Sequence, residues 1–166
     1  MNLDQLESGW QVVADANILV YHLAGLSEQC RRFVLRCHAG ELQGFMPVHT
    51  RLETLHRVMT LEAVRQGLVS GGNPARKLAE HPDRIARLSS RVGDVQALLA
   101  RFRWLDLTVQ AFERVPLLCL SRGLLANDAA LVATMLEHGL TRLASADRKL
   151  ERVPEVAVWK PDDLVA

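Results

Sequence analysis

Four acidic residues lie far apart in the sequence, each at a boundary or inside a segment with a clear structural pattern. They are Asp15, Glu53, Asp128 and Asp147. Carboxylates gathered in one place repel each other and raise each other's pKa values, so such a cluster needs a cation to neutralise it. Mg²⁺ or Mn²⁺ prefers oxygen ligands and keeps several waters, one of which can act as a nucleophile. If the four acids converge, the chemistry they predict is metal-assisted hydrolysis.

Each acid also has an ordinary structural explanation when it is taken alone. Asp15 and Asp128 are suited to cap the helices that follow them. Asp147 is suited to a turn in which its side chain accepts from the backbone two residues on. Glu53 and Arg57 are four residues apart, the spacing of an ion pair on one helix face. Only the joint placement of the four acids favours the metal site.

The elements that must position these acids alternate along the chain. Apolar runs predict strands at 11–14, 44–47, 103–108, 141–145 and 156–159, and helical periodicity predicts helices at about 17–24, 27–39, 48–66, 83–101, 109–121 and 127–138. Gly67–Pro82 is rich in Gly and Pro and predicts a loop or a break between helices, after which Asp83 is the expected helix cap. Strands separated by helices pair in parallel. We therefore expect an α/β fold, a three-layer α/β/α sandwich with a central, mostly parallel sheet.

That fold predicts where two of the acids meet. Ligands of an open parallel sheet bind beyond the carboxyl ends of its strands. Asp15 directly follows the first predicted strand, and Asp147 closely follows the fourth. Both residues are therefore expected at the same edge of the sheet.

The composition is that of an ordinary globular chain, with 49% apolar and 23% charged residues and a net charge of +1. Its 166 residues fit one domain, residues 1–166, with a helical insertion or arm around 67–103. No apolar stretch approaches the ~20 residues of a membrane span, and the acidic N-terminal segment does not resemble a secretory signal. The three cysteines lack paired spacing, which predicts free thiols and a reducing cytoplasm.

Other catalytic motifs are missing or incomplete in the sequence. Gly71-Gly72 lacks the Lys-Ser/Thr of a phosphate-binding P-loop, and no serine lies in a Gly-x-Ser-x-Gly elbow. Asp15-Ala16-Asn17 is not the Asp-x-Asp of phosphatases that form an aspartyl-phosphate. Glu53 and His56 have the Glu-x-x-His spacing of di-iron bundles, but such bundles carry the motif twice. None of these reactions is favoured.

Four sequence segments, taken in order, resemble the motifs of PIN-domain nucleases. The segments are VVADANILVYHL (12–23), TRLETLHRV (50–58), NDAALVA (127–133) and LASADRKL (143–150), and the tail VPEVAVWKP is similar to the closing strand of that family. One such motif would be weak, whereas four in order are a strong signal. The resemblance covers nearly the whole chain.

The resemblance implies roles for particular residues. Asp15, Glu53, Asp128 and Asp147 would be the catalytic and metal-binding acids, with Mg²⁺ or Mn²⁺ as cofactor, and Asn17 and Ser145 would support them. Family members generally cleave RNA with a metal-activated water and leave a 5′-phosphate and a 3′-hydroxyl. Many are VapC-type toxins held inactive by a small antitoxin protein. Arg51, Arg148 and Lys149 lie closest to the acids and are the expected RNA contacts.

Two features depart from the family pattern. Leu150 stands where relatives often have Phe, a mild change in an apolar position. The stretch 67–103 is longer than in compact toxins and would form an arm over the groove or part of a homodimer surface. Two other functions keep this fold: a catalytically inactive PIN-like module that binds RNA or protein, and a structure-specific DNA nuclease.

Overall fold

The fold is built on one five-stranded sheet. The computed structural model describes residues 1–164. Within them the strands are β1 (Gln11–Ala14), β2 (Gln43–Pro47), β3 (Arg103–Leu105), β4 (Arg142–Ala144) and β5 (Ala157–Trp159). They pair in the order β3-β2-β1-β4-β5, and every pair is parallel. The predicted strands are confirmed, although the third ends at Leu105 and not at 108.

Eight α-helices and two short 3₁₀ helices complete the described residues. They are η1 (Leu3–Gln5), α1 (Ala16–Ala24), α2 (Glu28–His38), α3 (Val48–Arg65), α4 (Pro74–Ala79), α5 (Pro82–Ala86), α6 (Ser89–Leu99), α7 (Val109–Arg122), α8 (Ala126–Glu137) and η2 (Arg148–Arg152). Among residues 1–164, no single helix is long and apolar enough to cross a membrane. The bent pair α7 and α8, whose axes differ by 118°, passes that test of length and composition only when the two are joined.

The helices form two layers because neighbouring side chains of a strand point to opposite faces of the sheet. Val12 and Ala14 of β1 pack in one core with side chains of α1, α2 and α6. Val13, between them, packs in a second core with side chains of α7 and α8. This arrangement confirms the expected three-layer α/β/α sandwich.

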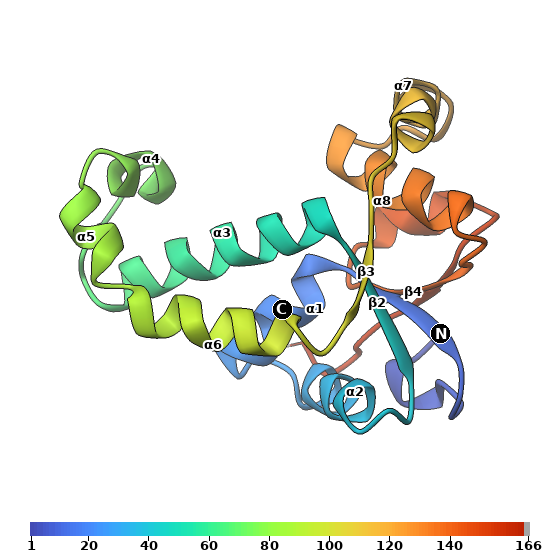
Figure 1. Ribbon diagram of the computed structural model, residues 1–166, viewed down its shortest axis with the longest axis horizontal. Helices are drawn as coiled ribbons and strands as arrows, with labels where there is room; N and C mark the ends of the chain where they lie inside the picture. The colour runs from blue at the N-terminus through green and yellow to red at the C-terminus, as the bar shows by residue number, and fades with distance from the viewer. Residues whose placement is uncertain (165–166) are drawn as a thin grey trace.

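A third, smaller apolar cluster lies away from the sheet. Its fully or largely buried members are Ala63, Leu68, Val69, Leu78 and Leu88. They come from the end of α3, from the loop that follows it, from α4 and from the break between α5 and α6. Figure 1 shows α4 and α5 at the far end of α3, with α6 running back beside it. This cluster packs the end of α3, α4 and the break between α5 and α6 against one another, so the stretch between α3 and β3 is folded.

Two local predictions in this stretch are wrong. The segment 67–82, expected to be a loop or a break between helices, separates α3 from α5 and contains the short helix α4, which begins at Pro74 with the side chain of Asn73 accepting from the Arg76 N–H at 3.1 Å. The two wrong predictions concern the helix that follows. The helix expected over 83–101 is two helices, α5 and α6. Asp83 lies inside the first turn of α5 and does not cap it, because Pro82 already occupies the first helical position.

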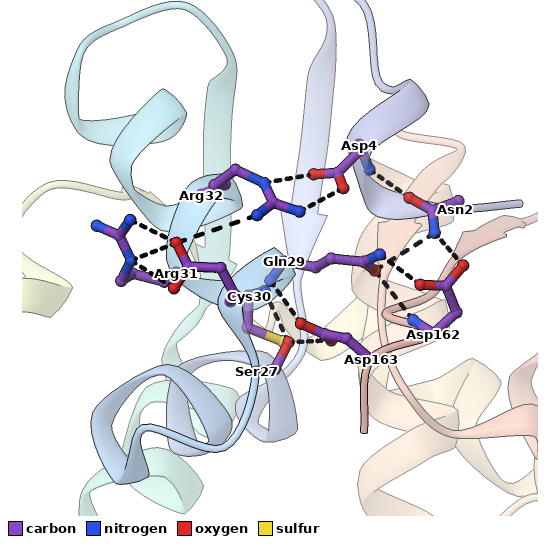
Figure 2. Close-up of polar contacts among 10 residues, drawn as sticks. Asn2, Asp4, Ser27, Gln29, Cys30, Arg31, Arg32, Asp162 and Asp163 are labelled. Atoms are coloured by element: carbon purple, nitrogen blue, oxygen red, sulfur yellow. Dashed lines mark hydrogen bonds and ion pairs between the residues drawn. The ribbon is translucent and has the colours of Figure 1, made fainter. Parts of the chain in front are cut away.

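The two ends of the described chain meet beside β5. Asn2 forms an isolated parallel bridge with Lys160, and its side-chain amide donates to Asp162 at 2.6 Å. The hydroxyl of Ser27, at the start of α2, donates to Asp163 at 2.6 Å. Figure 2 shows the two side-chain contacts, and we call them, together with the Asn2–Lys160 bridge, the terminal clasp. It fixes the segment after β5 against the N-terminal segment and α2.

Candidate functional site

Asp15 and Asp147 lie at the carboxyl ends of neighbouring strands. Asp15 follows β1 and Asp147 follows β4, and these strands are paired with Ala14 opposite Ala144. The backbone N–H of Asp15 donates to the Ala144 carbonyl at 2.9 Å, which continues the ladder one residue beyond β1. The sheet therefore brings the two acids to one edge, where ligands of parallel sheets bind.

Hydrogen bonds fix Asp15 relative to the loop after β4. Its Oδ2 accepts from the hydroxyl of Ser145 at 2.6 Å and from the side-chain amide of Asn17 at 2.5 Å. The same hydroxyl accepts from the Asp147 N–H at 3.0 Å, and Asn17 Oδ1 accepts from the Ala146 N–H at 3.0 Å. Ser145 is fully buried and Asn17 nearly so. Both residues therefore tie the two strand ends together around the Asp15 carboxylate.

The charges of the acids act on one another. Burial raises the pKa of Asp15 to about 6, an effect that the Ser145 hydrogen bond opposes and the charges of Glu53 and Asp128 reinforce. Burial also raises the pKa of Asp128, and the charge of Asp147 adds to that rise. The four acids that the sequence singled out thus share one electrostatic environment.

Capping does not explain the two acids whose pKa values are raised. Asp15 occupies the N-cap position of α1 but makes no side-chain capping hydrogen bond. The N-cap of α8 is Leu125, so Asp128 lies inside the first turn and does not cap it. Both carboxylates are partly buried, and a bound cation would offset the solvation that they lose.

The other two acids do make the local contacts expected of them. Glu53 forms an ion pair with Arg57 at 3.4 Å, between partly exposed side chains. Asp147 Oδ1 accepts from the Lys149 N–H at 2.8 Å and caps the short helix η2. Each contact uses one oxygen atom of the carboxylate, so within residues 1–164 the other oxygen of each residue is left as an acceptor.

The donor set suits a hard divalent cation. The candidate ligands are all carboxylate oxygens, which Mg²⁺ and Mn²⁺ prefer. Within residues 1–164 no three Asp, Glu, His or Cys side chains are grouped tightly enough to enclose a metal ion as they stand. Mg²⁺ keeps several of its waters and is usually held by only one or two carboxylates. The site therefore fits a hydrated ion.

Arg51 does not lie where a substrate contact would be, and this prediction is corrected. Its side chain is buried, and its guanidinium donates to the backbone carbonyls of Met46, Leu99 and Phe102 at 3.1, 2.6 and 2.7 Å. The guanidinium also stacks on the indole of Trp104, 3.7 Å from the ring centroid. Arg51 therefore joins the start of α3 to the end of α6 and β3.

Arg148 and Lys149 remain candidates for substrate contact. Both side chains are at least partly exposed, directly after Asp147. In the part of the chain that the structure describes, neither has an ion-pair partner. The charge of Lys149 lowers the pKa of Asp128, against the larger effect of burial, so this ammonium acts electrostatically on one of the acids.

Sequence reasoning missed Lys160 at the same edge. The Ser145 N–H donates to the Trp159 carbonyl at 3.0 Å, so Lys160 is the first residue beyond β5 beside the end of β4. The rule that singled out Asp15, a polar residue directly after an apolar strand, applies equally to Lys160.

A parallel sheet covered on both faces by helices, with an acidic edge of this kind, defines an α/β protein with a candidate metal-dependent hydrolase site. The sequence matches the PIN domain family over residues 12–156, and the chain belongs to that family. Proteins with PIN domains are typically nucleases. A comparison with curated proteins finds no match.

Solved structures with this fold span nearly the whole chain. VapBC2 from Rickettsia felis, solved with a DNA fragment from its promoter, has a TM-score of 0.61 at 11% identity, covering 92% of this chain and 99% of that one. DNA-bound VapBC from Salmonella typhimurium has a TM-score of 0.57 at 17% identity, with coverage of 91% and 98%. A toxin–antitoxin complex from Klebsiella pneumoniae has a TM-score of 0.53 at 18% identity, with coverage of 88% and 95%. At these identities the likeness shows the fold.

Proposed function

We propose that the protein is a Mg²⁺- or Mn²⁺-dependent endoribonuclease and the toxin of a toxin–antitoxin pair. One observation carries the catalytic part of the proposal. Asp15 is partly buried, makes no side-chain capping hydrogen bond and has its pKa raised by burial and by the charges of Glu53 and Asp128. Membership of a family whose members are typically nucleases supports the same reaction.

Each residue of the site has a distinct task under this proposal. Both side-chain hydrogen bonds to Asp15 reach Oδ2, and in the described residues Oδ1 has no side-chain partner, so Oδ1 is the atom offered to a cation. Asn17 and Ser145 hold that carboxylate in place. A bound divalent ion supplies a water of lowered pKa and stabilises charge on the attacked phosphate. Arg148 and Lys149 bind the phosphate backbone near Asp147.

A protein partner is supported by the surface as well as by the similar structures. The apolar side chains of Val109, Phe112 and Leu120 lie on α7 and are 70%, 60% and 87% exposed. Exposed apolar surfaces of this kind mark interaction sites. The similar structures from Rickettsia felis, Salmonella typhimurium and Klebsiella pneumoniae are toxin–antitoxin complexes by their descriptions. A small antitoxin is the partner we propose.

Digestion of matched RNA and DNA substrates tests the reaction. The wild type is incubated with each substrate in Mg²⁺, in Mn²⁺ and in chelator, beside Asp15→Asn and Asp147→Asn. Asp83→Asn, at an exposed acid in α5 and away from the sheet, is the matched control. We expect metal-dependent cutting of RNA that falls by roughly a hundredfold or more in the two site variants and stays unchanged in the control.

Three outcomes would contradict the proposal in different ways. If Mn²⁺ does not raise the melting temperature of the wild type, the inactive binding module is the better description, because a bound ion must stabilise the folded state. If DNA is cut faster than RNA, the protein is a DNA nuclease. If Asp15→Asn and Asp147→Asn cut as fast as the wild type, the acids are not catalytic. Growth arrest on expression, relieved by co-expression of a small neighbouring reading frame, tests the toxin assignment separately.

A further inference from the structure

A polar pocket of about 470 Å³ adjoins the acidic edge. Its walls come from three separate segments: the loop after β4, the segment after β5 and the N-terminal segment. The lining residues include Ala146, Arg148, Lys160, Asp162 and Asn2. Ala146 stands between Ser145 and Asp147, so the pocket begins next to the residues that hold Asp15.

The strand register places Lys160 beside this site. Ala144 of β4 pairs with Trp159 of β5, and the Ser145 N–H donates to the Trp159 carbonyl. Lys160 therefore leaves the sheet at the level of Ser145, whose hydroxyl binds Asp15. Three neighbouring strand ends thus carry Asp15, the Ser145–Arg148 loop and Lys160 in a row.

The charged groups of the pocket are arranged to receive an anion. Arg148 is at least partly exposed, and its guanidinium makes no ion pair with residues 1–164. The ammonium of Lys160 has three N–H donors and pairs with Glu151, so within residues 1–164 two donors are left for a ligand. The fixed fork of an arginine suits bidentate contact with a phosphate.

The carboxylate of Asp162 in the pocket wall is already engaged in hydrogen bonds. Its Oδ2 accepts from the side-chain amide of Asn2 at 2.6 Å, and its Oδ1 accepts from the side-chain amide of Gln29. Figure 2 shows both contacts, with Asp162 facing Asn2 and Gln29. Both donors are neutral amides, so Asp162 keeps its negative charge. The pocket lining still sets two cationic side chains, Arg148 and Lys160, against this one carboxylate.

The terminal clasp holds the backbone of this wall in place. The Lys160 N–H donates to the Met1 carbonyl at 2.8 Å, and the Lys160 carbonyl accepts from the Leu3 N–H at 3.0 Å. The backbone on which Lys160 is mounted is therefore held from both sides, by β4 and by the N-terminal segment. A site that is already ordered binds its ligand at a lower entropic cost.

We propose that this pocket binds a phosphate group of the substrate strand next to the one that is hydrolysed, with Arg148 and Lys160 as its ligands. The inference rests on the proposed ribonuclease function. A strand whose reacting phosphate lies against Asp15 carries further phosphates on both sides, and the acidic cluster repels them. The cations of the pocket offset that repulsion on the side of β4 and β5, so they set the direction in which the strand leaves the site.

Binding of a fluorescent single-stranded RNA over a series of salt concentrations tests the pocket. The measurements use an Asp15→Asn background, which removes cleavage. The slope of log K against log salt becomes shallower by about 0.7 for each phosphate of a single strand that the protein no longer neutralises. We expect that change in Arg148→Ala and in Lys160→Gln. Arg101→Ala, an exposed arginine at the opposite, amino end of the sheet, is the control and should leave the slope unchanged.

A second measurement locates the phosphate. RNAs that carry one uncharged methylphosphonate linkage at successive positions are compared for binding. In the parent protein, an uncharged linkage at one position next to the scissile phosphate should weaken RNA binding. In Arg148→Ala, the uncharged linkage at that position should cause no further loss of binding, whereas linkages at the other positions should have the same effect as in the parent protein. The Arg148 side chain reaches solvent and forms no ion pair within residues 1–164, so its replacement leaves the fold intact.

The outcomes separate the two proposals. If the Asp15→Asn protein binds no RNA, the ribonuclease proposal fails, and so does the inference that the pocket binds a phosphate of the substrate. If it binds RNA but both pocket variants keep the parent slope, only the pocket inference is overturned. If single-stranded DNA gives the same slopes, the pocket assignment stands as a contact to phosphate, and the choice of RNA depends on the digestion experiment.

Discussion

The burial of Asp15 carries a cost in stability that one substitution should remove. Its pKa is about 6 in the folded protein against an ordinary value of 3.8. Between these two pH values the folded state still holds a proton that the unfolded chain has released. The free energy of unfolding of the metal-free protein should therefore fall as the pH rises through this window. A difference of about two pKa units corresponds to about 3 kcal/mol.

Asp15→Asn removes the charge and keeps the local hydrogen bonds. The amide oxygen can take the place of Oδ2 and accept from Ser145 and Asn17. Because Asp15 keeps some contact with solvent, we treat about 3 kcal/mol as an upper limit and expect a gain of about 2 kcal/mol near pH 8. Near pH 4, where the wild-type carboxyl is protonated in the folded state, the gain should vanish.

Urea unfolding in the presence of a chelator, repeated across this pH range, measures the effect. The difference between wild type and variant isolates Asp15 from the other acids. Asp106→Asn is the control, since its carboxylate is exposed and its replacement should shift stability little at any pH. Parallel pH profiles for the wild type and Asp15→Asn, or a variant that is less stable near pH 8, would refute the argument from burial.

Two further substitutions test the surroundings of the site. Arg51→Met should lower the free energy of unfolding by at least about 3 kcal/mol, because three backbone carbonyls lose a charged donor. Urea unfolding measures this change, with Arg101→Met as the control. A decrease no larger than that of the control would contradict the prediction. Ser145→Ala should raise the pKa of Asp15 further, because the hydroxyl stabilises the carboxylate. NMR titration that follows the Asp15 carboxyl carbon measures this pKa. An unchanged or lower value would contradict the prediction.

The parts of the site that were predictable from the sequence are those set by local rules. Asp15 and Asp147 follow apolar runs, and the carboxyl ends of parallel strands share an edge. The alternation of Val12, Val13 and Ala14 between two cores follows from the geometry of any strand. The order of the five strands has no such local signal, since it depends on packing between distant segments.

Arg51 shows where local reasoning fails. Its place next to Glu53 on the sequence suggested a substrate contact. Two of the carbonyls that bind it belong to Leu99 and Phe102, which are 48 and 51 residues further along the chain. No residue near Arg51 in the sequence predicts those partners, so the burial of the Arg51 side chain is known only from the folded structure.

The helices between α3 and β3 were partly predictable. Asn73-Pro74 is both a turn signal and the start signal of a helix, with Asn as the cap and Pro in the first position. The turn signal alone predicts a loop, whereas the start signal predicts the helix α4 that the structure contains. The break between α5 and α6 has a different cause, because Leu88 is buried there in the small apolar cluster. Tertiary packing, and not helix propensity, sets that boundary.

The position of Met1 and Asn2 beside β5 has a consequence for handling the protein. Both residues line the same pocket as Arg148 and Lys160. A purification tag or fusion partner attached ahead of Met1 would emerge next to the acidic edge, where a run of histidines could bind metal or obstruct the strand. Enzymatic removal of such a tag is therefore a requirement for reliable assays of this protein.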